Sequence, residues 1–390
     1  MNESSAGLPP RTADPPGDSR QAWVEVSLDA ISRNVRIIRE RIGAGRRLLA
    51  VIKANAYGHG AVTVGRRLES DGIDLLGVAF PEEGLELRRA GISAPILVMG
   101  AASAHQLPAM IASRLIPTAY GLSFVAAIVA ESNRTANPIR FHLKVDTGMG
   151  RLGVLPEELP EALTRVAQAG GRAVIDGVFT TLSSSDQPDD PHTAAQLGVF
   201  AAALDRIRQA GAQPSYTHAA NSGGVIDHPP SWLDTVRPGI MLYGVRPSER
   251  STQLGLHPAL SFKGRLALVK SVPTGTPIGY GRSFITARRS LIGTVPAGYA
   301  DGLSRRISPG GHALVRGRRA PYAGRISMDH FTLDLTDIPG ASEGDEVVII
   351  GRQDGDSISA RQVAEWIGTI PYEVLCRIGP RVLRLTVGGS

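Results

Sequence analysis

Short apolar runs alternate with amphipathic segments along much of the chain. After a strand pattern at residues 23–28 and a helical pattern at 31–42, eight apolar runs have the length and composition of buried strands. They cover residues 48–53, 75–79, 95–99, 116–119, 139–145, 174–180, 215–219 and 234–240. Helical patterns lie between most of them, at 81–90, 104–113, 156–170 and 193–210. Eight βα units over roughly 210 residues have the size of one (β/α)8 TIM-type barrel, and we predict that α/β fold.

The main alternative is an open, doubly wound sheet that binds a nucleotide. Such a fold carries the glycine pattern G-x-G-x-x-G after its first strand. The chain instead has Asn-Ala-Tyr-Gly-His-Gly at residues 55–60. The barrel is therefore favoured.

The pattern changes after Pro258. Short β-like runs at 265–269, 290–295, 312–315, 346–350 and 381–387 are separated by Gly and Pro turns, with one helical stretch near 361–367. This change predicts a second, mainly β domain. Residues 1–20 are rich in Pro, Ser and Asp and predict a disordered tail. We therefore expect a tail at 1–20, a barrel domain at 21–258 and a β domain at 259–390.

Composition narrows the classes of partner. The net charge of +6 comes from scattered arginines, whereas nucleic-acid binding favours a basic cluster on one face. No apolar segment approaches the ~20 residues that span a bilayer, and the first residues lack the apolar core of a signal peptide. The single cysteine, Cys376, cannot form an internal disulfide, which suits a reducing compartment. We expect a soluble, cytoplasmic protein without a nucleic-acid or membrane partner.

Lys53 ends the first apolar run of the predicted barrel and is followed by small residues and glycines. Partial burial there disfavours the ammonium form, and the neutral amine can attack a carbonyl. Lys53 is thus a candidate for Schiff-base formation. A lysine whose ammonium simply reaches solvent from a strand end is the other interpretation of this segment.

Polar side chains gather where the predicted strands end, which is where barrel enzymes carry their chemistry. The loop from Lys144 to Arg151 ends in a guanidinium that suits a carboxylate or phenolate oxygen, although it also fits a tight turn with a solvated charge. The segment 218–222, His-Ala-Ala-Asn-Ser, precedes two glycines and could bind phosphate. A helix cap at Ser222 is the alternative. The other strand-end candidates are Lys53, Tyr57, Asp146, Thr180, Thr181, His218, Asn221, Arg237 and Gly239.

A lysine suited to a Schiff base together with a phosphate site indicates pyridoxal 5'-phosphate, which needs both. A metal enzyme is a poorer account, because the nine histidines show no HExxH or similar spacing. We therefore expect pyridoxal phosphate as the cofactor and no metal.

Eight motifs together resemble the alanine racemase family, whose members are fold-type III pyridoxal-phosphate enzymes. The resemblance covers residues 22–385. The motifs are AVIKANAYGHG (50–60), KVDTGMGRLG (144–153), HAANS (218–222), RPGIMLYG (237–244), IGYG (278–281), VPAGYADG (295–302), GRISMD (324–329) and PYEVLCRI (371–378). The resemblance implies an isomerase that interconverts L- and D-alanine in the cytoplasm, for D-alanine biosynthesis as a peptidoglycan precursor.

The resemblance also assigns cofactor-binding residues. Lys53 would carry the cofactor, and Arg237 would meet the pyridine nitrogen, where a permanent cation keeps that nitrogen unprotonated and limits side reactions. Asn221 would lie beside the cofactor. The phosphate-binding set would be Tyr57, Ser222, Gly239, Ile240 and Tyr372.

Inversion at Cα requires two bases on opposite faces of the substrate. The resemblance implies that Lys53 serves one face and Tyr280, from the partner subunit, serves the other. Arg151, Met328 and Tyr299 would contact the substrate or cofactor, and Met328 and Tyr299 would also come from the partner. The implied active unit is a head-to-tail homodimer. Lys144 matches a lysine that many relatives carry as a carbamate.

Thr181 departs from the family pattern, because a histidine normally stands at this position over the cofactor ring. Threonine supplies one hydroxyl but no ring and no switchable charge. A racemase with broader or altered specificity, or an impaired pyridoxal-phosphate-binding homologue, is therefore the alternative function. A non-catalytic cofactor carrier is disfavoured by the second domain with its IGYG and GRISMD motifs.

Overall fold

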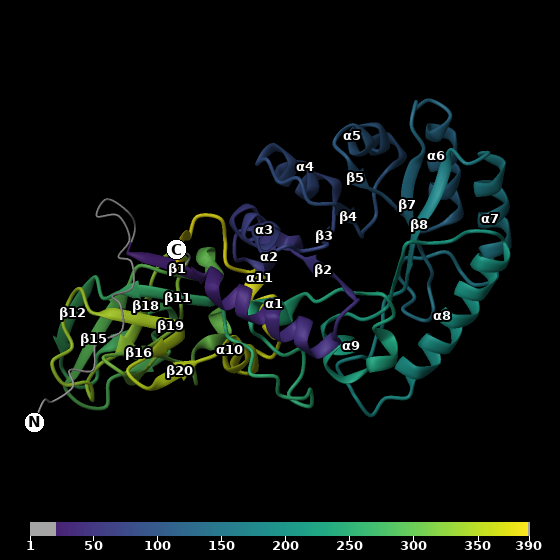
Figure 1. Cartoon of the computed structure of the whole chain (residues 1–390). Helices are drawn as coiled ribbons and strands as arrows, with labels where there is room; N and C mark the ends of the chain where they lie inside the picture. The colour runs from purple at the N-terminus through teal and green to yellow at the C-terminus, as the bar shows by residue number, and fades with distance from the viewer. Residues whose placement is uncertain (1–20, 389–390) are drawn as a thin grey trace, which may run out of the picture. The chain divides into compact units, whose positions relative to one another are not determined.

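The computed structural model describes residues 21–388, and the predicted tail at 1–20 lies outside them. The chain divides into two compact units (Figure 1). Ala30–Pro258 form one, which we call the barrel unit. The described residues 21–29 and 259–388 form the other, which we call the β unit. Each is described by itself below.

Eight parallel strands form the barrel unit, and they match the eight predicted apolar runs. They are β2 (Arg47–Val51), β3 (Leu75–Val78), β4 (Ile96–Val98), the pair β5 (Leu115–Ile116) and β6 (Thr118–Ala119), β7 (Ile139–Lys144), β8 (Ala173–Phe179), β9 (Tyr216–His218) and β10 (Thr235–Val236). β5 and β6 are two pieces of one strand on either side of Pro117, whose nitrogen cannot donate a hydrogen bond. The predicted TIM-type barrel is confirmed.

Strand pairing runs β10-β2-β3-β4-β5 and β6-β7-β8-β9, with every pair parallel. β10 pairs with β2, and the Arg237 amide donates to the Ala220 carbonyl at 2.8 Å between the ends of β10 and β9. Leu48, Leu49 and Ala50 of β2 are fully buried, as expected for a strand covered on both faces.

Helices follow most strands of the barrel. They are α1 (Leu28–Ile42), α3 (Ala61–Ser70), α4 (Pro81–Arg89), η1 (Ala104–Gln106) with α5 (Leu107–Ala112), α6 (Leu122–Ser132), α7 (Leu159–Gln168), α8 (His192–Gln209) and α9 (Ser222–Asp227). α4 begins at a proline, whose fixed φ suits the first helical position. The short η2 (Pro229–Ser231) and η3 (Ile240–Tyr243) flank β10.

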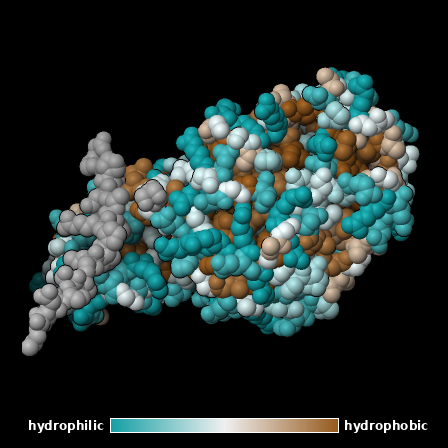
Figure 2. Space-filling model, viewed as in Figure 1, coloured by the Kyte–Doolittle hydropathy of each residue, from teal (hydrophilic) through white to brown (hydrophobic). Residues whose placement is uncertain are grey.

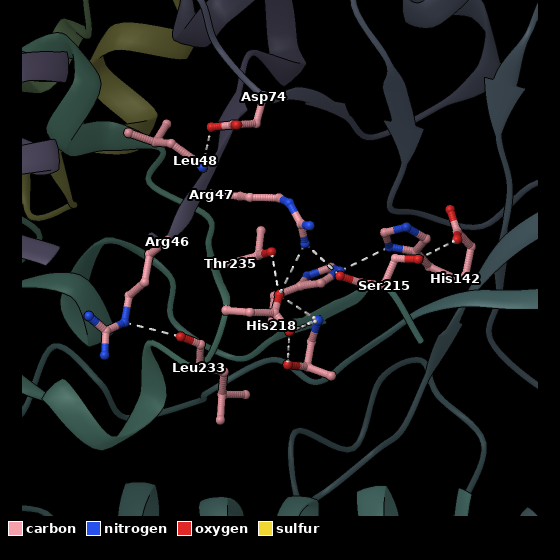
Figure 3. A network of polar contacts seen from close by, with 12 residues as sticks. Arg46, Arg47, Leu48, Asp74, His142, Ser215, His218, Leu233 and Thr235 are labelled. Atoms are coloured by element: carbon pink, nitrogen blue, oxygen red, sulfur yellow. Dashed lines mark hydrogen bonds and ion pairs between the residues drawn. The ribbon is translucent and has the colours of Figure 1, made fainter. Parts of the chain in front are cut away.

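Carboxylates tie the strands together at the N-terminal end of the barrel. The Leu48 amide donates to Asp74 Oδ2 at 2.9 Å, and an Arg47 guanidinium nitrogen donates to the Ser215 carbonyl at 2.6 Å (Figure 3). Asp234 accepts from the Thr217 amide at 2.9 Å and from the hydroxyls of Thr217 and Thr235. This end of the barrel is a hydrogen-bonded frame.

The β unit contains a seven-stranded sheet in the order β17-β16-β19-β11-β1-β21, with β20 paired to β19. These strands are β17 (Arg318–Pro321), β16 (His312–Val315), β19 (Glu346–Gln353), β11 (Leu260–Arg265), β1 (Ala22–Ser27), β21 (Leu383–Val387) and β20 (Asp356–Ile358). A second sheet joins β12 (Leu268–Val272), β15 (Ser290–Val295) and β18 (Phe331–Asp334), and β13 (Pro277–Ile278) pairs with β14 (Phe284–Ile285). α10 (Ala360–Ile367) and α11 (Pro371–Cys376) complete the unit. The predicted second, mainly β domain is present.

The first strand lies on the other side of the expected domain division. We expected residues from 21 onward to belong with the barrel, but β1 pairs antiparallel with β11 and parallel with β21. Those two neighbours satisfy the backbone groups on both edges of β1, and Trp23, Val24 and Val26 are buried in this unit. The part of the chain that the structure describes therefore begins in the β unit and returns to it after the barrel unit.

The surface seen in Figure 2 carries hydrophilic side chains with smaller hydrophobic areas between them. Among residues 21–388 no helix combines the length and the hydropathy needed to cross a membrane.

Candidate active site

Basic side chains collect at the C-terminal end of the barrel. Lys53 follows β2, Lys144 ends β7, His218 ends β9 and Arg237 follows β10. Lys144 and Arg237 both lie over the Phe179 ring, at 5.5 and 5.3 Å from its centroid. Parallel strands of a barrel present their C-terminal ends on one face, so residues far apart in sequence meet there.

The backbone after Lys53 makes one left-handed turn. α2 (Lys53–Tyr57) has φ values of 52, 54, 53 and 53° from Ala54 to Tyr57, none of which is glycine. A left-handed turn costs L-residues roughly 1–2 kcal/mol each. Such strain persists only where surrounding contacts over-determine the backbone, and it is often found at functional sites.

Tyr57, Ser222 and Gly239 lie against one another. The Gly239 amide donates to Ser222 Oγ at 2.9 Å. A Cβ added at Gly239 would lie 2.4 Å from the Tyr57 hydroxyl oxygen, so only glycine fits this approach. The Tyr57 ring packs on Tyr243 with centroids 5.1 Å apart. The Tyr57 and Ser222 hydroxyls thus both lie against Gly239, at the start of η3, which suits a phosphate group.

Asn221, rather than Ser222, caps α9. Its Oδ1 accepts from the Gly224 amide at 3.0 Å and from the Ser185 hydroxyl at 2.6 Å. Its Nδ2 donates to the Leu182 carbonyl at 3.3 Å. The Ser222 hydroxyl is therefore not needed as the cap and faces Gly239, which answers the alternative raised by the sequence.

A buried chain of hydrogen bonds runs from Arg237 through two histidines. Arg237 Nη1 donates to His218 Nδ1 at 3.0 Å, and His218 Nε2 lies 2.9 Å from His142 Nδ1 (Figure 3 shows the two histidines). Arginine has no acceptor, so His218 Nδ1 accepts and its Nε2 carries the proton that it donates to His142. Nη2 of Arg237 donates to the carbonyls of Thr180, at 2.7 Å, and Ala219, at 3.1 Å.

Both histidines are neutral. Burial, the Arg237 charge and His142 hold the pKa of His218 well below its usual range. Burial lowers the pKa of His142 to about 4, with Asp176 opposing the shift and Arg237 adding to it. Burial also lowers the pKa of Arg237, to about 9, and the guanidinium remains a cation at neutral pH. The hydrogen-bonded group of Arg237, His218 and His142 therefore carries one positive charge, on Arg237.

Lys144 has a lowered pKa. Burial, followed by the charges of Arg237 and Arg151, lowers its pKa to about 8, with a smaller contribution from Lys53 and an opposing one from Asp146. Neutral amine is therefore present at physiological pH. These charges show that the fold brings Lys53, Lys144, Arg151 and Arg237 within electrostatic reach of one another.

The loop from Lys144 to Arg151 wraps around one carboxylate. Asp146 Oδ1 accepts from the amides of Gly148, Met149 and Gly150 at 2.9 to 3.1 Å, and its Oδ2 accepts from the Arg151 amide at 3.1 Å. Burial opposes ionisation of Asp146, but these amides outweigh it and lower the pKa. The tight turn suggested by the sequence exists, and it leaves the Arg151 side chain exposed.

Thr181 lies in a segment clamped by a buried glutamine. Gln196 of α8 donates to the Thr181 carbonyl at 3.0 Å and to Thr147 Oγ1 at 3.3 Å. Its Oε1 accepts from the amide and hydroxyl of Ser183 at 2.9 and 3.1 Å. The Thr180 and Thr147 hydroxyls are 2.7 Å apart. The backbone at Thr181 is thus fixed beside the residue that anchors Arg237.

The remaining predicted residues lie in the β unit. Tyr280 begins η4 (Tyr280–Arg282) between two glycines with φ near 70°, and it is 72% exposed. Met328 and Tyr299 are 52% and 42% exposed. Tyr372 is the second residue of α11. An open cleft of about 360 Å³ beside Tyr280 is lined by Gly279, Tyr280, Arg325, Ser327, His330, Phe331 and Thr332.

Arg381 joins the loops that carry Tyr299 and Met328. Its Nε donates to Asp301 Oδ1 at 2.7 Å, and Nη2 donates to Asp329 Oδ1 at 2.8 Å. The Ala300 amide also donates to the Met328 carbonyl at 3.1 Å. These bonds fix the exposed side chains of both loops on one framework.

No group of three or more His, Cys, Asp or Glu residues with a geometry for metal binding occurs in the part of the chain that the structure describes.

Sequence reasoning missed the pairing of His142 with His218 and the clamp at Gln196. The period of two along a strand was an available signal, since it puts His142 on the same face as Lys144. Gln196 gave no such signal.

Comparison with known proteins gives the same family for both parts of the chain. Residues 26–247 match the family model "Alanine racemase, N-terminal domain", and residues 259–386 match "Alanine racemase, C-terminal domain". An alanine racemase of Symbiobacterium thermophilum is 43% identical over 370 residues, which are 95% of this chain and 98% of the relative.

Two solved structures have the same fold. The alanine racemase of a D-cycloserine-producing Streptomyces lavendulae is 38% identical with a TM-score of 0.91, over 95% of this chain and 98% of that one. The alanine racemase of Bacillus anthracis, solved with bound L-Ala-P, is 35% identical with a TM-score of 0.89, over 95% of each chain. With both domains matched in order over nearly the whole length, the chain belongs to the alanine racemase family of isomerases.

Proposed function

We propose that this protein interconverts L- and D-alanine with pyridoxal phosphate bound at the C-terminal end of the barrel unit. The observation that carries the proposal is the arrangement of Lys53 and Tyr57 at the two ends of one left-handed turn, with the Tyr57 hydroxyl against Gly239 and Ser222. An amine and a phosphate site joined by so short a segment fit a cofactor that has an aldehyde and a phosphate on one ring.

The residues present fit this cofactor at both of its polar ends. The phosphate would be held by Tyr57, Ser222 and the amides of Gly239 and Ile240 in the barrel unit and by Tyr372 of the β unit, which is the set that the resemblance implies. Arg237 uses three N–H groups on His218, Thr180 and Ala219, and two of its five donors remain for the pyridine nitrogen. Because the Arg237 guanidinium is a cation at neutral pH, it would donate to the ring nitrogen and keep it unprotonated.

When bound, pyridoxal phosphate delocalises electrons from Cα of an amino acid and so makes the Cα proton acidic. Lys53 would hold the cofactor and move the proton on one face of Cα. The partner subunit's Tyr280 would move the proton on the other face, and the partner's Met328 and the partner's Tyr299 would contact the substrate. Arg151 would lie near the cofactor oxygen, and Asn221 beside the ring.

A head-to-tail homodimer would complete the site. The high exposure of Tyr280 and Met328 within their own unit supports this, since a general base needs a reacting partner within hydrogen-bond reach. Altered substrate specificity remains the second candidate, favoured by Thr181 at the usual histidine position. A threonine beside the clamped Thr180 segment leaves more room than an imidazole.

The decisive experiment incubates cofactor-loaded protein with L-alanine in deuterated water and follows both deuterium at Cα and the appearance of D-alanine. We expect deuterium incorporation with inversion. Exchange with retention would contradict the two-base assignment, and absence of exchange would contradict the function.

Tyr280→Phe isolates the second base. It should slow turnover from L-alanine by about 10²–10⁴-fold, the usual contribution of a general base, while cofactor binding is unchanged. Tyr216→Phe is the matched control, because it removes only a hydroxyl at the N-terminal end of the barrel and keeps the ring that packs on Arg47 and His142. A panel of L-serine and basic amino acids measures specificity, and faster turnover of any of them than of alanine would favour the second candidate.

A further inference from the structure

One carboxylate holds three backbone amides from two neighbouring strand ends of the barrel unit. Glu83 Oε1 accepts from the Ala54 amide at 2.6 Å. Its Oε2 accepts from the amides of Ala79 at 2.7 Å and Phe80 at 3.2 Å. Ala54 follows Lys53 after β2, whereas Ala79 and Phe80 follow β3. Glu83 thus joins the lysine segment to the next βα loop.

The Ala54 amide stands at the start of the left-handed turn, where no earlier residue of the turn can accept its hydrogen bond. Within the turn, the Ala56 amide donates to the Ile52 carbonyl at 2.8 Å and the Gly58 amide to the Ala54 carbonyl at 3.0 Å. Glu83 therefore supplies from α4 the acceptor that the turn itself lacks.

His59 holds the other end of the same turn. Its Nδ1 lies 3.0 Å from the carbonyls of both Ala56 and Tyr57. A backbone conformation that four non-glycine residues disfavour is thus tied at both ends by side chains. The conformation of this turn sets the separation between the Lys53 amine and the Tyr57 hydroxyl.

We propose that Glu83 is a positioning residue, which holds the turn after Lys53 in its left-handed form and so matches the amine and the phosphate site to one cofactor. The inference rests on the proposed function for the identity of that cofactor. A role limited to capping α4 through the Phe80 amide is the competing account.

Glu83→Ala, Glu83→Gln and Gln106→Ala separate the two accounts in the full-length protein. Gln106 is the matched control, because its Oε1 accepts from the Ser103 amide at 2.8 Å at the start of η1 in the same unit. It has the same capping role as Glu83. Its Nε2 donates to Glu82 Oε1 at 2.7 Å at the start of α4, but its hydrogen bonds in the described chain do not include residues 53–57.

Amide hydrogen exchange of the cofactor-free protein gives the first readout. We expect Glu83→Ala to speed exchange in residues 53–60 by at least about tenfold, equivalent to about 1.4 kcal/mol. Glu83→Gln, which keeps one acceptor oxygen, should lie between it and the wild type. Gln106→Ala should leave residues 53–60 unchanged. Wild-type exchange of residues 53–60 in Glu83→Ala would overturn the proposal.

The second readout is the binding of pyridoxal phosphate and of pyridoxal, followed by absorbance. If the turn sets the spacing between the amine and the phosphate site, Glu83→Ala should weaken the binding of pyridoxal phosphate by about tenfold. It should weaken the binding of pyridoxal, which lacks the phosphate, by far less. Equal losses for both would overturn the proposal. Failure of the wild type to attach either compound at Lys53 would instead contradict the proposed function, and the exchange data would still decide whether Glu83 holds the turn.

Discussion

The two ends of the barrel use charge in opposite ways. At the N-terminal end, the carboxylates of Asp74, Asp176 and Asp234 each accept hydrogen bonds from neighbouring strands. At the C-terminal end, Lys144 and Arg237 both lie over the Phe179 ring, and burial together with the Arg237 charge lowers the pKa of Lys144. Charges that satisfy donors stabilise a fold, whereas like charges gathered in a buried place mark chemistry. Stability and function are thus divided between opposite ends of the same strands.

The backbone shows the same division. The N-terminal ends are joined by regular bonds such as Arg47 N to the Asp234 carbonyl at 2.8 Å. The C-terminal end after β2 has four left-handed residues in succession. Variants at the two ends should therefore fail in different assays.

The largest effect is expected for Lys53→Ala. Loss of the amine should abolish covalent attachment of pyridoxal phosphate and lower racemisation by more than about 10³-fold. The free energy of unfolding should change by less than about 0.5 kcal/mol, because Lys53 is partly exposed. Mass spectrometry after borohydride reduction checks the attachment, with exposed Lys270→Ala as the control. Racemisation that survives in Lys53→Ala would contradict the assignment.

Asp234→Ala should give the opposite result. It removes the acceptor of the Thr217 amide and of two hydroxyls, which should lower the free energy of unfolding by about 2 kcal/mol. The kcat of folded protein should change little, since the Asp234 side chain bonds groups at the N-terminal ends of β9 and β10, whereas Lys53 and Arg237 follow the C-terminal ends of their strands. Urea titration measures the loss.

Asp205→Ala is the control for that measurement. Among residues 21–388, Asp205 forms only an exposed ion pair with Arg208 at 3.6 Å, and its removal should cost less than about 0.5 kcal/mol. If the fall in kcat of Asp234→Ala, expressed as a free energy, exceeds its loss of unfolding free energy, the division between the two ends is wrong.

The division explains which features the sequence could predict. The eight strands were predictable because each is a short apolar run with its own local signal, and Lys53, Tyr57, Ser222 and Arg237 lie at strand ends as expected. The place of β1 was not predictable, since it depends on pairing with β21 at the far end of the chain. Hydrophobic alternation shows that a strand exists but not which partners it has.

The left-handed turn also left no trace in the sequence. Residues 54–57 contain no glycine, and their local preference is right-handed. The turn depends on hydrogen bonds to the side chains of Glu83 and His59, and these bonds form only in the folded chain. The His142–His218 pair is similar, because β8 lies between β7 and β9. Residue types at the site were therefore predictable, and the contacts that position them were not.

Gly239→Ala should have a moderate effect confined to the C-terminal end. The added Cβ would lie 2.4 Å from the Tyr57 hydroxyl oxygen, and packing on Tyr243 restricts movement of that ring. We expect pyridoxal phosphate affinity to fall by about tenfold, measured by absorbance titration. Gly198→Ala is the control, because the Cβ position at Gly198 in α8 has open space around it, and it should not lower the affinity for pyridoxal phosphate. Unchanged affinity in Gly239→Ala would remove Gly239 from the phosphate site.

The smallest effect concerns the charge of Lys144. With its pKa lowered to about 8, roughly one tenth of its amine is neutral at pH 7, against less than one part in a thousand for an ordinary lysine. The neutral amine can form an N–C bond to carbon dioxide and release a proton, which gives a carbamate anion. We expect ¹³C-bicarbonate to label Lys144 increasingly from pH 6.5 to 8.5, because the neutral fraction rises through that range.

Buried Lys263 is the control, since its ammonium is paired with Glu25 at 3.0 Å and Glu346 at 3.1 Å and should not be labelled. Nuclear magnetic resonance of the labelled carbon detects the product, and no signal from Lys144 at pH 8.5 would contradict the prediction. The carbamate would replace a cation that repels Arg151 and Arg237 by an anion that attracts both. The C-terminal end would then gain the complementary charge that the N-terminal end has from its aspartates, and it would gain it by a reaction that the lowered pKa makes possible.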